Sequence, residues 1–239
     1  MLRTLLVVLP SILVLGIAVF GVMIPVTWIL GDVGPMYAMT RHGLRLLFRL
    51  AGVRVEVRGF DPWKAPQPCV FLCNHVSNLD PPALFAYLPR VAVIAKAVLF
   101  RWPLLGRAMK MGEFIEVVRN KADSRRQAME SGITRLRNGR SLLIFPEGTR
   151  SRDGAMLPFR PGPFTMAIET QVPLVPITIL GARELLRKGK MGIRPGCLRL
   201  VIHPPVPTAG MTVANREPLM KQVRETIASA LRGQPGRHC

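Results

Sequence analysis

The chain of 239 residues carries 33 Lys and Arg against 14 Asp and Glu, a formal net charge of +19. Half of it (49%) is hydrophobic and its mean hydropathy is +0.27, which excludes an intrinsically disordered protein and argues against an ordinary nucleic-acid-binding domain. A chain that is both basic and apolar indicates an anionic membrane surface as its partner, and its length predicts one main domain.

The amino-terminal region contains an uncharged, apolar stretch of 26 residues, from Leu5 to Leu30. As a helix this stretch would be about 39 Å long, which is enough to cross a bilayer. Pro10 and Pro25 interrupt it, so a broken helix that enters the membrane and returns is an open alternative. The stretch lacks the short apolar core and the small-residue cleavage site of a signal peptide, and we expect the chain to retain it.

The segment 36–50 has Arg41, Arg45 and Arg49 at every fourth position, which predicts an amphipathic helix with one basic stripe. We interpret it as a helix at the headgroup level of the membrane, with a helix packed on the protein core as the alternative. Residues 1–50 are therefore predicted to form a membrane anchor. Because cytoplasmic segments carry an excess of Lys and Arg, residues 51–239 are expected to face the cytoplasm from the inner membrane.

From residue 53 onward, short strand-like runs alternate with helical patterns. Val53, Val55 and Val57 alternate with charged residues, which is typical of a half-buried strand. Further buried strands are predicted at 69–73, 91–95, 114–118, 142–145, 174–180 and 198–202. Helices are predicted over 124–138, capped at its start, and over 219–231. This alternation predicts an α/β fold with a central, largely parallel sheet flanked by helices and with functional sites at the carboxyl ends of strands.

The strand predicted at 69–73 runs directly into Asn74 and His75, and Asp80 follows the histidine five residues later. A histidine paired with a carboxylate keeps one ring nitrogen as an acceptor, which a general base needs to take a proton from a hydroxyl. The two side chains can meet only if the stretch is a turn, and Pro81 supports a helix that begins there with Asp80 as its N-cap. The alternative, in which Asp80 only caps the helix and His75 only bonds backbone, fits this motif equally well.

A second polar cluster follows the strand predicted at 142–145, and its residues are Glu147, Gly148, Thr149 and Arg150. The planar guanidinium of Arg150 suits a phosphate group, and Gly148 permits close approach of the backbone. A surface turn with a solvated ion pair is the alternative. Arg119 ends another predicted strand, where it is placed for one more phosphate contact.

Together these segments resemble the glycerophospholipid acyltransferase family, and in particular its 1-acyl-sn-glycerol-3-phosphate acyltransferase branch. The resemblance covers roughly residues 53–203 and rests on several blocks that occur in order. The blocks are N-H-x-x-x-x-D at 74–80, an arginine-bearing block at 112–119, F-P-E-G-T-R-S at 145–151 and a V-P-x-x-P-I run at 172–177. The second block departs from the family pattern at Glu116 and Val118, so only Arg119 is carried over from it.

The resemblance implies attack by the sn-2 hydroxyl of 1-acyl-sn-glycerol-3-phosphate (lysophosphatidic acid) on an acyl thioester, which gives phosphatidic acid for phospholipid biosynthesis. It implies His75 as the general base, Asp80 as the group that orients it, and residues 51–239 as the acyltransferase domain. The substrate-binding residues that it implies are Asn74, Lys96, Arg119, Glu147, Gly148, Thr149 and Arg150. The partners would be membrane lipids and an acyl donor, either acyl-CoA or acyl carrier protein, and neither a cofactor nor a metal is expected.

Two other functions stay open. The acceptor could be another lysolipid, such as a lyso-ornithine lipid or a different lysophospholipid. The chain could also be a non-enzymatic basic protein of the membrane surface or of nucleic acid. Aromatic residues make up only 6% of the chain and none of them is interleaved with basic residues for base stacking, so no nucleic-acid partner is expected.

Overall fold

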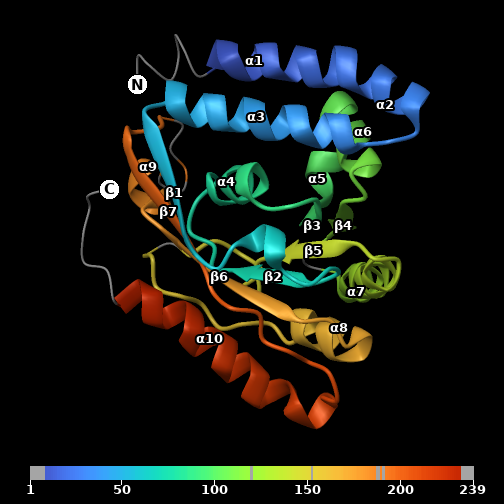
Figure 1. Ribbon diagram of the computed structural model, residues 1–239, viewed down its shortest axis with the longest axis vertical. Coiled ribbons are helices and arrows are strands. Elements are labelled where there is room, and N and C mark those ends of the chain that lie inside the picture. Colours follow the sequence, from blue (N-terminus) through green and yellow to red (C-terminus); the bar gives the residue numbers. More distant parts are fainter. Residues whose placement is uncertain (1–8, 119–120, 152, 187–188, 190–191, 233–239) are drawn as a thin grey trace.

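The computed structural model describes residues 9–118, 121–151, 153–186, 189 and 192–232, and its elements surround one central sheet (Figure 1). The strands are β1 (Val53–Gly59), β2 (Val70–Cys73), β3 (Val91–Lys96), β4 (Ile115–Val117), β5 (Ser141–Ile144), β6 (Leu174–Leu180) and β7 (Gly196–Ile202). In the described part of the chain they form a seven-stranded sheet of order β1-β7-β6-β2-β5-β3-β4. Each neighbouring pair is parallel except β6 and β7. The predicted α/β fold with a largely parallel sheet is confirmed.

Helices cover both faces of this sheet. They are α3 (Gly34–Leu50), α4 (Asp80–Tyr87), α5 (Ala97–Phe100), α6 (Pro103–Met111), α7 (Ala122–Arg137), α8 (Gly162–Thr170), α9 (Ala182–Leu185) and α10 (Arg216–Arg232). Because side chains alternate along a strand, β2 serves both cores. Phe71 joins the core under α3 and α4, while Val70 and Leu72 join the core under α7, α8 and α10. The central strands are buried on both sides, which explains their continuous apolar runs.

Helix α7 begins two residues before the predicted start at Ser124. Ser124 does not cap it, because its hydroxyl accepts the N–H of Val118 (2.9 Å) at the end of β4. The predicted carboxyl end is confirmed, since Gly139 follows the helix with a φ of 77°, a value that glycine adopts without strain. Ser124 therefore anchors the strand to the helix that follows it.

The amino-terminal elements form an interrupted helix that runs back along α3 (Figure 1). It consists of α1 (Leu9–Ile17), a π-helical stretch (Ala18–Met23) and α2 (Ile24–Leu30), and Gly31 with a φ of 65° ends it. Among the helices of the described residues, none combines the length and the apolar character needed to cross a bilayer. The predicted membrane anchor therefore stays a prediction.

Helix α3 packs on the main domain. This arrangement is the alternative that the sequence analysis gave for segment 36–50. The hydroxyl of Tyr37 donates to the carbonyls of Val91 and Gly112, both at 3.0 Å. Two of the three stripe arginines also contact protein. Arg45 donates to the carbonyl of Ala86 at 2.9 Å, and the guanidinium of Arg41 lies 4.5 Å from the ring centroid of Trp63.

Candidate active site

The turn between β2 and α4 brings the side chains of His75 and Asp80 together. Nδ1 of His75 lies 2.8 Å from Oδ2 of Asp80, and the same oxygen accepts the backbone N–H groups of Val76 and Ser77, both at 2.7 Å. Asp80 is the first residue of α4 and Leu79 is its N-cap, so the helix begins one position earlier than predicted. Because a carboxylate only accepts hydrogen bonds, Nδ1 carries the ring proton and Nε2 is left as an acceptor.

The second motif holds the backbone and the ring of His75. The N–H of His75 donates to Oε1 of Glu147 (2.7 Å), and its carbonyl accepts the N–H of Ser151 (2.9 Å). The ring of Phe145 stacks on the imidazole with centroids 4.1 Å apart. The two motifs therefore form one unit around the histidine, although His75 and Glu147 are 72 positions apart in the sequence.

Glu147 lies behind His75 rather than in the cavity. Its second oxygen accepts the N–H of Leu157 at 2.8 Å, so both oxygens bind backbone. Burial raises the pKa of this carboxyl, while its backbone hydrogen bonds and the charge of Arg224 act in the opposite direction. This arrangement is that of a structural bridge between two loops, and it differs from the predicted contact with the acceptor.

Asn74 is likewise bound to the framework. Its Nδ2 donates to the carbonyl of Ile179 (3.1 Å) and its Oδ1 accepts the N–H of the same residue (2.8 Å). The side chain thus continues the pairing of β2 with β6 beyond the end of β2. Gly148 has a φ of 70°, and an added Cβ would lie 2.5 Å from Nε of Arg160, so this turn requires glycine.

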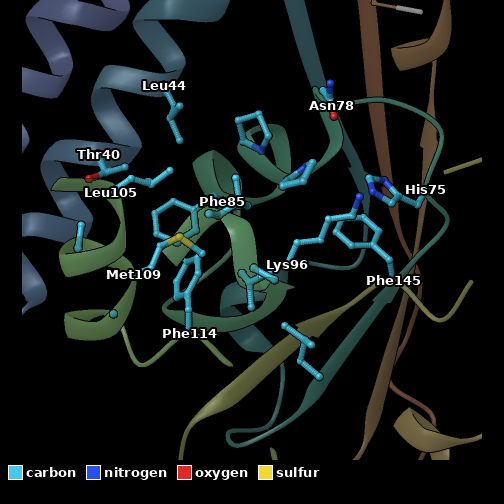
Figure 2. Close-up of a pocket in the computed structure, with 18 of the residues that line it drawn as sticks. Thr40, Leu44, His75, Asn78, Phe85, Lys96, Leu105, Met109, Phe114 and Phe145 are labelled. Atoms are coloured by element: carbon cyan, nitrogen blue, oxygen red, sulfur yellow. The ribbon is translucent and has the colours of Figure 1, made fainter. Parts of the chain in front are cut away.

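A cavity of about 530 Å³ opens beside the histidine and extends between α3, α4 and α6. His75, Lys96, Thr149 and Arg150 line it together with Phe145. The apolar lining comes mainly from these helices, from α5 and from the turn before β4: Met36, Tyr37, Leu44, Phe85, Leu99, Leu105, Met109 and Phe114. Figure 2 shows His75 and Phe145 on one side and Met109 and Phe114 on the other, with Lys96 between them. The site therefore joins a polar end to an apolar end.

The structure brings some predicted site residues to the cavity and not others. His75, Lys96, Thr149 and Arg150 line it, Asp80 lies behind His75, and Arg119 falls outside the described residues. The lining residues that the sequence analysis missed lie mainly on α3, α4 and α6. Their signal was present, since Tyr37, Thr40 and Leu44 share one face of a helix at spacings of three and four.

No group of His, Cys, Asp and Glu suited to a metal ion occurs in the residues that the structure describes. Cys73 is a free, fully buried thiol, and burial raises its pKa well above the ordinary value. Such a thiol is a poor nucleophile. The groups placed for chemistry in the cavity are therefore the imidazole of His75 and the cationic side chains near it.

Comparisons with known proteins show which family this chain resembles. The sequence profile of the family described as Acyltransferase matches residues 54–180. The chain is 37% identical over 155 residues to 1-acyl-sn-glycerol-3-phosphate acyltransferase BAT2, chloroplastic, of Brassica napus, an alignment that covers 64% of this chain and 45% of that protein. It is 35% identical over 185 residues to the human 1-acyl-sn-glycerol-3-phosphate acyltransferase alpha, covering 77% of this chain and 65% of that protein. The chain thus spans about half to two-thirds of the length of these curated relatives.

A solved structure matches over the whole chain. It is the crystal structure of the 1-acyl-sn-glycerophosphate (LPA) acyltransferase PlsC from Thermotoga maritima, with a TM-score of 0.84 and 25% sequence identity. The match covers 100% of this chain and 98% of that one. The similarity therefore extends to the amino-terminal helices that precede the region matched by the profile.

Proposed function

The chain belongs to the acyltransferase family, and from this membership we propose that it transfers an acyl group from a thioester to the sn-2 hydroxyl of 1-acyl-sn-glycerol-3-phosphate, forming phosphatidic acid. The relatives are named as acyltransferases of 1-acyl-sn-glycerol-3-phosphate, which supports this acceptor. The observation that carries the proposal is the 2.8 Å contact between His75 Nδ1 and Asp80 Oδ2, because it leaves Nε2 of a cavity-lining histidine as a proton acceptor.

In the proposed reaction, Nε2 of His75 takes the proton of the acceptor hydroxyl while its oxygen attacks the thioester carbonyl carbon. The tetrahedral intermediate then collapses, the C–S bond breaks, and the departing thiolate receives the proton from His75. Asp80 stabilises the imidazolium that exists between these two proton transfers. In this proposal the transfer is direct, with no acylated side chain, which agrees with a described cavity lining that contains neither serine nor cysteine.

The two ends of the cavity suit the two parts of the lipid substrates. Lys96 and Arg150 give the polar end a positive charge, which favours the phosphate of the acceptor. Arg119 would add a further phosphate contact, as the family resemblance implies. The apolar end between α3 and α6 suits an acyl chain, because transfer of apolar surface out of water is favourable.

We propose that residues 1–50 hold the enzyme at the cytoplasmic face of the inner membrane. Three large side chains at the end of α2 support this: Trp28 is 84% exposed, Ile29 76% and Leu30 62%. An exposed apolar patch rimmed by basic residues is typical of an interfacial anchor. In this proposal α3 belongs to both regions, because it also forms a wall of the cavity.

To test the proposal, lysophosphatidic acid and a labelled acyl donor, either acyl-CoA or acyl carrier protein, are added to membranes that contain the protein. Wild type is compared with His75→Ala and with His42→Ala, whose histidine is exposed on α3. We expect labelled phosphatidic acid from the wild type and from His42→Ala, and its loss in His75→Ala. Equal product from all three would remove His75 from the mechanism. Product only with a lyso-ornithine lipid or another lysophospholipid would replace the acceptor.

A further inference from the structure

We propose that Arg224 and Glu147 are positioning residues, which hold the backbone of His75 at the cavity through the loop that contains Met156 and Leu157. This inference rests on the proposed function, because the reaction that the two residues would assist is the proposed acyl transfer. It assigns a role to helix α10, which contributes no residue to the cavity lining of the described chain. A continuous series of contacts leads from α10 to His75.

The first contacts join α10 to the loop. Nη1 of Arg224 donates to the carbonyl of Leu157 (2.5 Å) and Nη2 donates to the carbonyl of Met156 (2.9 Å). The same guanidinium lies 5.4 Å from the ring centroid of Phe159. Residues 153–160 form neither helix nor strand, so their backbone groups need partners of this kind. Arg224 therefore fixes the loop at two adjacent carbonyls.

The next contacts join the loop to the histidine. The N–H of Leu157 donates to one oxygen of Glu147 (2.8 Å), and the N–H of His75 donates to the other (2.7 Å). Hydrogen bonds that involve an ionised group are shorter and stronger than neutral ones. The carboxylate of Glu147 thus joins two loops. Leu157 is held from both sides, because its N–H donates to Glu147 and its carbonyl accepts from Arg224.

The position of His75 depends on its backbone contacts, which are the hydrogen bond to Glu147 and the one that its carbonyl accepts from the N–H of Ser151 (2.9 Å). Asp80 and Phe145 fix the orientation of the imidazole, whereas Glu147 fixes the backbone from which the ring projects. Displacing a general base by about 1 Å can cost two orders of magnitude in rate. A loose loop would therefore lower the rate of proton transfer without removing any group from the cavity.

Three variants test the proposal, with Lys221→Met as the matched control, since Lys221 is exposed on α10. Arg224→Met keeps the length of the side chain and removes both donors, and Arg224→Lys keeps the charge. Glu147→Gln keeps the shape, but its amide offers one acceptor for two N–H donors. We expect kcat with lysophosphatidic acid to fall about tenfold or more in Arg224→Met and Glu147→Gln, with the KM of the acceptor little changed. Arg224→Lys should restore part of the rate.

A double variant tests whether the two residues act along one path. If Arg224 acts through Glu147, Arg224→Met should lower kcat less in the Glu147→Gln background than it does in the wild type. Multiplicative losses in the double variant would overturn the shared path. A loss that appears only in the KM of the acceptor would overturn positioning, because it would indicate a contact with substrate.

A readout independent of activity separates this proposal from the proposed function. Hydrogen–deuterium exchange should accelerate in Arg224→Met within peptides that cover 153–160 and also within peptides that cover 74–80, and Lys221→Met should match the wild type. If exchange around His75 is faster in Arg224→Met but the wild type acylates no lysolipid, the positioning contacts are supported and the proposed function is refuted. Wild-type kcat together with wild-type exchange in folded Arg224→Met would overturn the positioning role.

Discussion

A single carboxylate oxygen organises the histidine turn. Oδ2 of Asp80 accepts three hydrogen bonds, whereas Oδ1, which is also buried, has no hydrogen-bond partner among the described residues. Asp80 lies in the first turn of α4, where the helix dipole favours a negative charge. The carboxylate therefore lies where an imidazolium would form, and its hydrogen bonds to the imidazole and to the turn all converge on one oxygen.

Asp80→Asn tests the charge separately from the shape. The amide oxygen can take the place of Oδ2, and the amide nitrogen can take the place of Oδ1, so we expect the folded structure to persist. Without the charge the imidazolium is less stable, and kcat should fall by about 10²- to 10⁴-fold. The measurements are acyl-transfer rates and thermal unfolding. Wild-type activity in a variant with unchanged melting temperature would contradict the role of Asp80.

Residues that act locally could be predicted, and residues whose partners are distant could not. His75 and Asp80 are five positions apart, so the turn that joins them could be inferred from Pro81 and the spacing alone. Asn74 and Glu147 were predicted to bind substrate, yet Asn74 binds Ile179, 105 positions away, and Glu147 binds the backbone of His75, 72 positions away. Such pairings depend on the order of strands in the sheet.

At the scale of elements, the cavity lies between helices that come from three parts of the chain. Helices α3, α4 and α6 contribute Tyr37, Phe85 and Met109 to its wall. Tyr37 and Phe85 stack with ring centroids 5.0 Å apart. Burial raises the pKa of Tyr37 to about 12, so its hydroxyl remains a hydrogen-bond donor. The stacked rings and the hydrogen bonds of Tyr37 join the helices of this wall, and in the proposed function its position sets the space available to an acyl chain.

Met109→Trp should shorten the space at the far end of the cavity. Met109 is 6% exposed on α6, and a larger ring there would occupy volume that an acyl chain needs. We expect the preferred acyl donor to become shorter, with little loss of rate for the shortest chains. Competition among acyl-CoA donors of graded length measures the shift. Met220→Trp on α10, outside the cavity lining, is the control, and an unchanged preference in Met109→Trp would argue against this location for the chain.

A second contact between elements makes stability depend on pH. The hydroxyl of Thr178 on β6 donates to the carbonyl of Ile227 on α10 (3.0 Å) and lies 2.9 Å from Nε2 of His203, which follows β7. Burial lowers the pKa of His203 from its ordinary value of 6.5. The folded state therefore prefers the neutral ring.

The sign of this effect follows from proton binding. Between the lowered folded pKa and 6.5, the unfolded chain binds more protons, so the free energy of unfolding falls as the pH is lowered through this range. Above this pH range, the contribution of neutral His203 to the free energy of unfolding is fully present. His203→Gln should lack this part of the pH dependence. Urea unfolding at several values between about pH 8 and pH 5 measures it, and parallel curves for both proteins would contradict the assignment.

Periodicity predicted the long elements well and the short connecting helices poorly. Strand β6 spans the predicted residues Leu174–Leu180, because its apolar run is bounded on both sides. Helices α5 and α6 were not predicted, since α5 has four residues and α6 begins directly after it at Pro103. The start of α7 was misplaced because Ser124 serves as an acceptor for β4 instead of a cap. These departures lie where two elements meet.

At the scale of the whole molecule, exposed apolar side chains occur at the carboxyl end of α2 and around the start of α6, and α6 contacts the π-helical stretch that precedes α2. Trp28 is 84% exposed on α2, and Trp102 is 61% exposed just before α6. Tryptophan is favoured at the interface between water and lipid. This surface, combined with a net charge of +19, favours binding to anionic membranes through both apolar and electrostatic attraction.

Trp28→Ser combined with Ile29→Ser should weaken binding to vesicles that contain anionic lipid. Removing these two large apolar groups is expected to lower the partition coefficient about tenfold or more. Vesicle sedimentation at low and high salt measures it, and the remaining binding should be more sensitive to salt. Val213→Ser, at a residue 58% exposed in the short 3₁₀ turn Val213–Asn215, is the control. Equal effects of both changes would contradict an anchor at α2.

The position of β1 at the edge of the sheet has a consequence for biosynthesis. β1 pairs only with β7, whose residues leave the ribosome about 140 positions later. At about 5 to 20 residues per second, β1 waits roughly 7 to 30 seconds for its partner. Arg54, Glu56 and Arg58 alternate along it, and charges of this kind discourage pairing with the wrong strand. The amino-terminal helices, which we propose as the membrane anchor, are therefore synthesised well before the sheet is complete.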